Sequence, residues 1–295
     1  MAKRKIVDAH HHFWQLSRGY NYPWLQDAPA GEGMLGDLAP IVRDYGLADY
    51  LTDTKNYDVV GSVHVEAVPR DPLDETRWLH ALSGRLPSAI VAFAALDAPD
   101  AEQIIATQAS FPRVKGIRQI VNWHPNPSLT FTPRNLLADD AWRSGYRLLR
   151  KYGLSFDMQL YAVQMVDAAD VARRYPDTLM IVNHAGMPAD RNTQGIADWR
   201  AGLKLLAATE NVVIKVSGFG MVDHRWTPES IRPLILHAVD CFGVDRVMFA
   251  SNFPVDRLYG SFADVYRAFE MIVADFSPDE QDRMFRGNAL RHYRI

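Results

Sequence analysis

Eight short apolar runs, rich in β-branched residues, recur along the 295-residue chain and constrain its fold more than any other feature. Runs of this kind, bounded by turn-forming residues, indicate buried β-strands. Helical segments lie between them, so the chain contains repeated βα units, which build parallel sheets. We expect strands at Lys5–Trp14, Val59–Val68, Ala89–Asp97, Val114–Val121, Leu154–Tyr161, Leu179–Gly186, Val212–Gly218 and Arg246–Asn252.

Helical periodicity is assigned to eight segments, none of which lies between the third and fourth strands. Two of them begin with clear start signals, because Asp71-Pro72 and Ser277-Pro278 place a capping side chain before a proline at the first helical position. The segments are Asp37–Thr52, Asp71–Arg85, Ala138–Tyr152, Val163–Tyr175, Ile196–Thr209, Pro228–Phe242, Ser261–Asp275 and Ser277–Tyr293.

This succession predicts a (β/α)8 TIM barrel, formed as one domain over residues 1–295. A doubly wound open sheet is the alternative architecture. It is disfavoured because no glycine-rich phosphate-binding loop follows an early strand, and for the same reason we expect no nucleotide cofactor.

The segments that leave the strands are long and rich in Pro, Gly and aromatic residues. In a barrel these loops meet at the C-terminal ends of the strands, where active sites form. The first, Phe13–Gly36, carries Trp14, Tyr20, Tyr22 and Trp24 and is too long for a simple connection, so we expect it to form a wall or lid of the site.

The first strand carries three consecutive histidines, His10, His11 and His12. Alternation along a strand places His10 and His12 on one face and His11 on the other. Two imidazoles spaced in this way can share one metal ion or one substrate. An engineered tag is the alternative, but tags are longer and are not flanked by a strand-like apolar run.

Polar side chains also occur at the ends of the other strands, where apolar residues are expected. Each also has a purely structural explanation. His64 can be a buried histidine that is hydrogen-bonded within the barrel, Lys215 can form an ion pair with Glu66 or Asp157, and Arg118 can neutralise a carboxylate. Several buried charges that converge on one barrel mouth nevertheless indicate a site, since unpaired burial is costly. The candidates are His64, Glu66, Arg118, Asp157, Gln159, Asn183, His184, Lys215, Ser217, Asn252 and Asp256.

Composition narrows the class of protein. The net charge is −3 and basic residues are scattered, so nothing favours a nucleic acid or a membrane surface. No apolar run is long enough to span a bilayer and no secretory signal precedes Asp8, so we expect a cytoplasmic protein. Cys241, the single cysteine, is expected to be a buried inert thiol.

The sequence resembles the amidohydrolase superfamily, and within it the amidohydrolase-2 family, in the branch of sugar-acid and dicarboxylate lactonases. Asp-Ala-His-His-His-Phe-Trp at the start, Asn-His-Ala-Gly on the sixth strand and Ser-Asn-Phe-Pro-Val-Asp on the eighth carry this resemblance. It implies a distorted barrel of the metal-dependent-hydrolase type. Val-His-Val-Glu-Ala, Lys-Gly-Ile-Arg-Gln and Asn-Ala-Leu-Arg-His-Tyr extend the resemblance over nearly the whole chain.

By motif position, His10, His12 and His184 match the histidines that hold metal in the superfamily, so the resemblance implies one divalent ion, zinc or manganese. Asn252 stands where the superfamily has a metal-binding, proton-accepting aspartate, and an amide cannot be a general base. Gln159 replaces a histidine, and Arg118 replaces a bridging lysine or glutamate. These departures disfavour a tightly bound metal, and the resemblance allows for this, because the lactonase branch includes members that need no metal.

The resulting hypothesis is a hydrolase that opens a lactone by attack of water, in carbohydrate or aromatic catabolism. Its substrate is a small molecule, and a homodimer is left open. His10, His12 and His184 polarise the carbonyl group, Asn252 orients water or substrate, and the base is Glu66, Asp256 or His184. Substrate contacts are assigned to Arg118, Gln159, Trp24, Lys215 and Asp256.

Two other functions stay open at this point. One is a metal-dependent non-oxidative decarboxylase of the same family, which the changes at Gln159 and Asn252 disfavour. The other is a binding protein that has lost catalysis, which Asn252 motivates.

Overall fold

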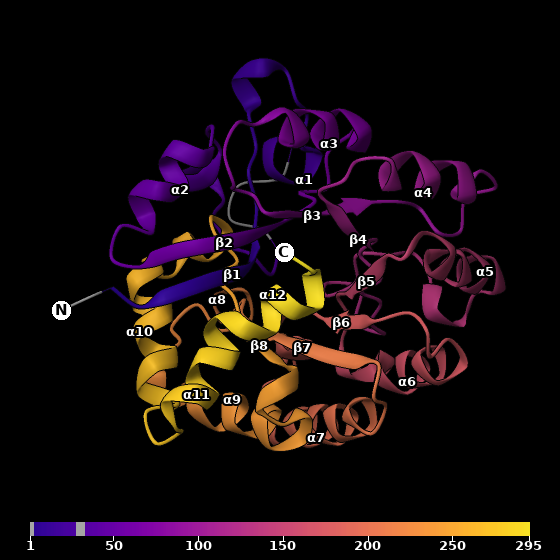
Figure 1. The fold of residues 1–295 in the computed structure, drawn as a ribbon. Coiled ribbons are helices and arrows are strands. Elements are labelled where there is room, and N and C mark those ends of the chain that lie inside the picture. Colours follow the sequence, from indigo (N-terminus) through magenta and orange to yellow (C-terminus); the bar gives the residue numbers. More distant parts are fainter. Residues whose placement is uncertain (1–2, 28–32) are drawn as a thin grey trace.

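The computed structural model describes residues 3–27 and 33–295, and eight strands form its centre. All paired neighbours are parallel and follow one another in chain order from β1 to β8, with helices around them (Figure 1). The strands are β1 (Lys5–His11), β2 (Asp58–Val65), β3 (Ala89–Phe93), β4 (Val114–Arg118), β5 (Ser155–Met158), β6 (Met180–Val182), β7 (Val212–Val216) and β8 (Val247–Phe249).

The ring closes between the segments that end β1 and follow β8. The His12 N–H donates to the Phe253 carbonyl at 2.7 Å, and the Asn252 N–H donates to the His10 carbonyl at 2.8 Å. The predicted (β/α)8 barrel is therefore confirmed. The closure therefore pairs the backbone of His10 with that of Asn252, and the backbone of His12 with that of Phe253.

The helices are α1 (Pro23–Gln26), α2 (Leu47–Asp53), α3 (Pro72–Ala81), α4 (Ala101–Ala109), α5 (Asp140–Leu148), α6 (Met165–Arg174), α7 (Thr193–Ala207), α8 (Phe219–Val222), α9 (Pro228–Phe242), α10 (Phe262–Ile272), α11 (Pro278–Asp282) and α12 (Asn288–Tyr293). Both predicted start signals are confirmed, since Asp71 and Ser277 accept hydrogen bonds from the N–H groups of Asp74 and Glu280. Among the described residues, no helix is both long and apolar enough to cross a membrane.

Two helix predictions need correction. α4 lies between β3 and β4, where no helix was assigned, because its buried face contains only Ala101, Ile105 and Gln108 and gives little periodic contrast. The segment Asp37–Thr52 is helical only from Leu47 onward, apart from a short 3-10 turn.

Apolar side chains form two layers on either side of the strands. One fills the barrel interior and includes Val7, Ala9, Val65 and Val213, while the larger lies between the strands and the helices. Tyr293 of α12 joins the interior layer and is fully buried. The interior is thus closed on that side, and the site forms at the other end of the strands.

A β-bulge in β1 determines which histidines enter the barrel. Asp8 pairs with Ser62 and His11 pairs with His64, so β1 carries one extra residue over this stretch. Strict alternation from Val7 and Ala9 would turn His11 inward. The extra residue reverses the alternation and directs His10 toward Lys215 in the interior.

Helix α5 packs against the backbone that follows β3 at Gly145. A methyl group added there would overlap the Leu96 carbonyl group, whereas one added at Gly287 meets only ordinary contacts. We expect Gly145→Ala to lower the free energy of unfolding by about 1–3 kcal/mol through overpacking. Gly287→Ala, the matched control at a helical φ of −59°, should be neutral or slightly stabilising. Denaturant unfolding measures both, and equal effects would contradict this account of the packing.

Candidate active site

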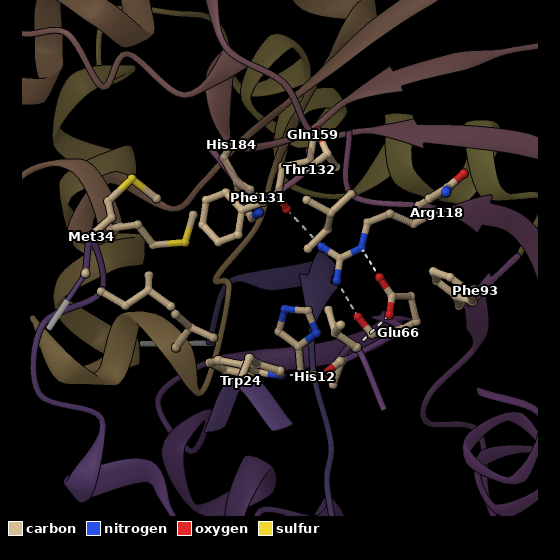
Figure 2. A pocket seen from close by; sticks show the side chains of 18 of the residues that line it. His12, Trp24, Met34, Glu66, Phe93, Arg118, Phe131, Thr132, Gln159 and His184 are labelled. Carbon is tan, nitrogen blue, oxygen red and sulfur yellow. Dashed lines mark hydrogen bonds and ion pairs between the residues drawn. The ribbon is translucent and has the colours of Figure 1, made fainter. Parts of the chain in front are cut away.

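A cavity of about 600 Å³ opens at the C-terminal ends of the strands. Seven of the ten predicted site residues line it. Figure 2 shows the cavity, with Arg118 bonded to Glu66. The seven are His12, Trp24, Glu66, Arg118, Gln159, His184 and Asn252. The other three, His10, Lys215 and Asp256, are buried behind the cavity surface and do not line it.

His10 and His12 form a directional hydrogen-bonded chain with Lys215. The Lys215 ammonium has only donors, so its 3.2 Å contact makes His10 Nδ1 an acceptor and leaves the ring proton on Nε2. His10 Nε2 lies 3.3 Å from His12 Nε2, and His12 Nδ1 donates to the Val65 carbonyl at 2.7 Å. Burial, followed by the positive charges of Lys215 and Arg118, holds the pKa values of both rings well below 6.5, so both are neutral.

Lys215 forms a buried ion pair with Asp157 across the barrel interior. The two side chains are fully buried, and the Tyr293 hydroxyl donates to the same Asp157 oxygen at 2.9 Å. Of the two partners predicted for Lys215, the structure selects Asp157. Burial lowers the pKa of Lys215 to about 8, although Asp157 opposes that shift. Lys215 is therefore charged at neutral pH and acts on the site through His10.

Arg118 is held against Glu66 at the cavity surface. Its Nε donates to Glu66 Oε1 at 2.6 Å, one Nη donates to the Glu66 carbonyl group, and the other Nη donates to Gln159 Oε1 at 3.1 Å. A guanidinium carries five N–H groups, so two remain for a ligand. The carboxylate that Arg118 was predicted to neutralise is therefore that of Glu66.

Both oxygens of the Glu66 carboxylate accept hydrogen bonds from the protein. Its second oxygen accepts from the Val68 N–H at 2.7 Å. Val68 is β-branched yet has a φ of 54°, a strained conformation that such contacts must maintain. Each oxygen thus accepts one hydrogen bond from the protein, and through these bonds Glu66 positions Arg118 and this turn.

Glu75 supports the same turn from α3, and the sequence prediction did not include it. Its Oε1 accepts from the Ala67 N–H at 3.2 Å. Burial raises the pKa of Glu75 to about 8, and Glu75 in turn helps to raise the pKa of Glu66, which is raised chiefly by burial. A signal was present in the sequence, because Glu75 shares a helix face with the buried Trp78 and Leu79.

His184 presents its second ring nitrogen to the cavity. Its Nδ1 lies 3.0 Å from the Ser217 hydroxyl, which leaves Nε2 for a ligand. Burial and then Arg118 hold the pKa of His184 well below 6.5. A methyl group at Gly218 would lie 2.6 Å from His184 Nδ1, so only glycine permits this approach. Sequence reasoning listed Ser217 at a strand end but assigned it no role.

Asn252 joins the cavity to the buried Asp256. Its Nδ2 donates to Asp256 Oδ1 at 3.1 Å, and its φ of 57° is positive, like those of Val68 and His184. Burial raises the pKa of Asp256 to about 7. Asp256 therefore contacts Asn252 and does not contact the cavity, in contrast to its predicted role as a substrate ligand.

His64 and His11 lie on the outer side of the strands. His64 Nδ1 accepts from the Phe13 N–H at 3.1 Å, and His11 Nε2 bonds to the Ser62 hydroxyl at 2.9 Å. His64 is thus a structural histidine. Of the four loop aromatics, Trp24 lines the cavity and donates to the Ala67 carbonyl at 2.7 Å, whereas Trp14 and Tyr22 belong to the core. Part of the predicted wall, residues 28–32, lies outside the described residues.

The side chains that could hold a divalent metal meet only part of what such an ion requires. The 3.3 Å separation of His10 Nε2 and His12 Nε2 suits two ligands of one ion. However, a metal-binding histidine normally donates its other N–H to an acceptor, and His10 faces the Lys215 ammonium instead. The amide of Asn252 supplies no charge, and the described residues hold no converging group of three His, Cys, Asp or Glu side chains. These residues therefore do not fit a tightly held metal. The metal implied by the resemblance, zinc or manganese, stays a prediction.

The amidohydrolase family model matches residues 7–295. The chain belongs to the amidohydrolase family. The resemblance inferred from the three motifs is confirmed, and with it the interpretation of the chain as a hydrolase of this family rather than a binding protein.

Several proteins are similar to this chain over nearly the whole length of both chains. An uncharacterised protein of Sinorhizobium fredii is 38% identical over 100% of both chains. The L-fucono-1,5-lactonase of Burkholderia ambifaria is 30% identical, with 98% of this chain and 95% of the relative covered. A solved amidohydrolase structure from Burkholderia multivorans superposes with a TM-score of 0.83 at 26% identity, covering 98% and 99% of the two chains, and one of its crystal forms has bound zinc.

The Glu66 contacts predict a coupled loss of stability and activity. In Glu66→Gln the Arg118 charge remains buried without its counter-charge, which should cost about 3–5 kcal/mol of unfolding free energy. Activity should fall as Arg118 loses its position. The matched control Glu102→Gln removes an exposed ion pair with Lys151 and should leave the melting temperature unchanged. A Glu66→Gln protein with wild-type melting temperature and turnover would eliminate this role.

The buried Glu75 carboxyl predicts a pH dependence of stability. Its pKa rises from 4.5 to about 8 on folding, so its favourable contribution is full below about pH 4.5 and is lost as the pH rises through 8. Glu75→Gln keeps the acceptor oxygen and cannot ionise. The difference in melting temperature between Glu75→Gln and wild type should therefore become more positive from pH 5.5 to pH 9, with the exposed Glu210→Gln as control. A constant difference would show that Glu75 ionises normally.

Proposed function

We propose that this protein is a lactonase that hydrolyses a neutral lactone, such as the lactone of a sugar acid, to the open hydroxy acid. The observation that carries the proposal is the internal balance of charge around the cavity. The charged lining residues are Glu66, Asp97, Arg118 and Arg134, two of each sign. The similarity to proteins named L-fucono-1,5-lactonase, at 30% identity, supports the same reaction class.

The pairing of these charges favours an uncharged substrate. Arg118 is neutralised by Glu66, and Arg134 at the cavity rim bonds to Asp97 at 2.9 Å and to Asp139 at 3.0 Å. No uncompensated cation among the described lining residues is available for a substrate carboxylate. A dicarboxylate would bring two negative charges beside cations that are already neutralised, which makes a dicarboxylate lactone the less favoured substrate.

The arrangement provides an electrophile and a base on one cavity wall. The two remaining N–H groups of Arg118 hydrogen-bond the lactone carbonyl oxygen and stabilise the oxyanion that forms on attack. Water attacks the carbonyl carbon and gives its proton to His184 Nε2, the neutral ring nitrogen open to the cavity. When the ring C–O bond breaks, His184 returns that proton to the leaving alkoxide, so the products are a carboxylic acid and a hydroxyl group.

Other groups position these two residues. Glu66 and Gln159 fix the guanidinium of Arg118, and Ser217 fixes the ring of His184. Lys215 keeps His10 in the tautomer that donates to His12, and Asn252 is placed to hold the attacking water through its amide oxygen. Of the three bases considered from the sequence, His184 is favoured because Glu66 is the counter-charge that holds Arg118 and Asp256 does not line the cavity.

Decarboxylation is less well supported. Solved structures named as decarboxylases share 13% and 12% identity with this chain and indicate only a common fold. The family's decarboxylation chemistry, as inferred above from the sequence, depends on a metal, and the donor set here does not fit one.

The proposal predicts loss of turnover in His184→Asn. The amide keeps a hydrogen-bonding group but cannot accept a proton, so kcat should fall by about 10²–10⁴. A pH-indicator assay with L-fucono-1,5-lactone measures it, with 2-pyrone-4,6-dicarboxylate as the charged comparison that should turn over more slowly. The matched control is His237→Asn on α9, outside the cavity, which should retain wild-type rates.

The same assay examines the role of metal. Dialysis against a chelator should leave turnover unchanged, because no step above uses a metal. Wild-type rates in His184→Asn would refute the assignment of the base, and abolition of activity by the chelator with recovery on adding zinc would refute the metal-free mechanism.

A further inference from the structure

The cavity has two chemically different ends. The polar groups described above gather at its base. Its outer part carries the paired charges of Arg134 and Asp97 and, elsewhere, an apolar wall on which Met34 and Phe131 lie opposite the Arg118–Glu66 pair in Figure 2. The outer apolar residues are Met34, Leu35, Leu38 and Phe131, whereas Met221 lies deeper, beside His184.

The outer apolar surface is held in place by hydrogen bonds of its backbone. The carbonyl group of Met34 contacts His224 Nε2 at 2.9 Å, and that of Leu35 accepts from the Tyr259 hydroxyl at 2.5 Å. The Phe131 N–H donates to the Asn122 carbonyl at 2.9 Å, yet its side chain is 49% exposed. An aromatic ring left open beside a cavity presents apolar surface that a ligand can cover.

The cavity also exceeds what a small ring lactone needs. A volume of about 600 Å³ lies within the range of pockets that enclose drug-sized ligands. A ring bound by Arg118 and His184 at the base would leave the outer apolar part uncovered. Hydroxyl groups placed there would lose water without gaining partners, whereas hydrocarbon would gain from burial.

We propose that the preferred substrate is a neutral lactone that carries an alkyl or aryl substituent, and that this substituent occupies the outer apolar part of the cavity. The proposal rests on the lactonase function proposed above and narrows its substrate class. The ester group lies against Arg118 and His184, and the substituent extends past Phe131 toward Met34.

The test is a series of δ-lactones with unbranched alkyl substituents of increasing length, together with the aryl lactone dihydrocoumarin. Each methylene buried in the outer part should raise kcat/KM by about threefold to fivefold, mainly through KM, until the chain leaves the cavity. Dihydrocoumarin should exceed unsubstituted δ-valerolactone. Values of kcat/KM that stay flat or fall with chain length would overturn the proposal.

Two variants test whether the gain in kcat/KM arises at the outer apolar residues. Met34→Gln and Phe131→Ser place polar groups on the outer wall and should reduce the ratio of kcat/KM between the longest and the shortest lactone by about tenfold. Met271→Gln, at an exposed methionine of α10 outside the cavity, is the matched control and should retain the wild-type ratio. Because Phe131 is half exposed, Phe131→Ser is expected to fold. An unchanged ratio in both cavity variants would place the substituent elsewhere and overturn the proposal.

The outcomes separate this proposal from the lactonase function itself. If no lactone of any kind is opened, both fail. If δ-valerolactone and L-fucono-1,5-lactone are opened but substituents bring no gain, the lactonase function stands and only the substituent proposal fails.

Discussion

The buried ion pair between Lys215 and Asp157 is the interaction on which the rest of the site depends. Two charges in a barrel interior cost several kcal/mol each to desolvate, and they are retained only if each is closely partnered. Here Tyr293 adds a hydrogen bond to Asp157 from the closed side of the barrel, and Lys215 turns its remaining donors toward Ala9 and His10. The pair therefore connects Tyr293, at the closed side of the barrel, to His10 behind the cavity.

The charge of Lys215 then fixes the protonation of the histidines beside it. A cation against His10 Nδ1 places the ring proton on Nε2, which directs a donor toward His12. Arg118 acts in the same direction on His12 and His184, so that burial and positive charge together keep all three rings neutral. A neutral imidazole can accept a proton near pH 7, which an imidazolium cannot. In the proposed mechanism His184 therefore serves as the base, and Asn252 stands at the position where the resemblance implies an aspartate.

Much of this could be predicted from the sequence, because strand periodicity and the polar strand ends are local signals. The barrel followed from repeated βα units, and seven of the ten predicted residues line one cavity. The partners within the site could not be predicted, because they depend on register between distant segments. Whether Lys215 pairs with Glu66 or Asp157 is decided by their depth in the barrel, and a bulge decides which histidines face inward.

Other features were missed because their signals are weak or arise only in the folded chain. Helix α4 buries too few apolar residues to show a period, and Met34 and Phe131 lie in loops whose composition does not reveal a cavity. Val68, His184 and Asn252 all adopt positive φ at strand ends, although none is a glycine. Such strain persists only where surrounding contacts determine it. At Val68 those contacts come from Glu66, at His184 from Ser217, and at Asn252 from the barrel closure at His10 and from Asp256. The same hydrogen bonds therefore maintain the strained backbone and aim the side chains into the cavity, so activity and local stability are expected to change together at these positions.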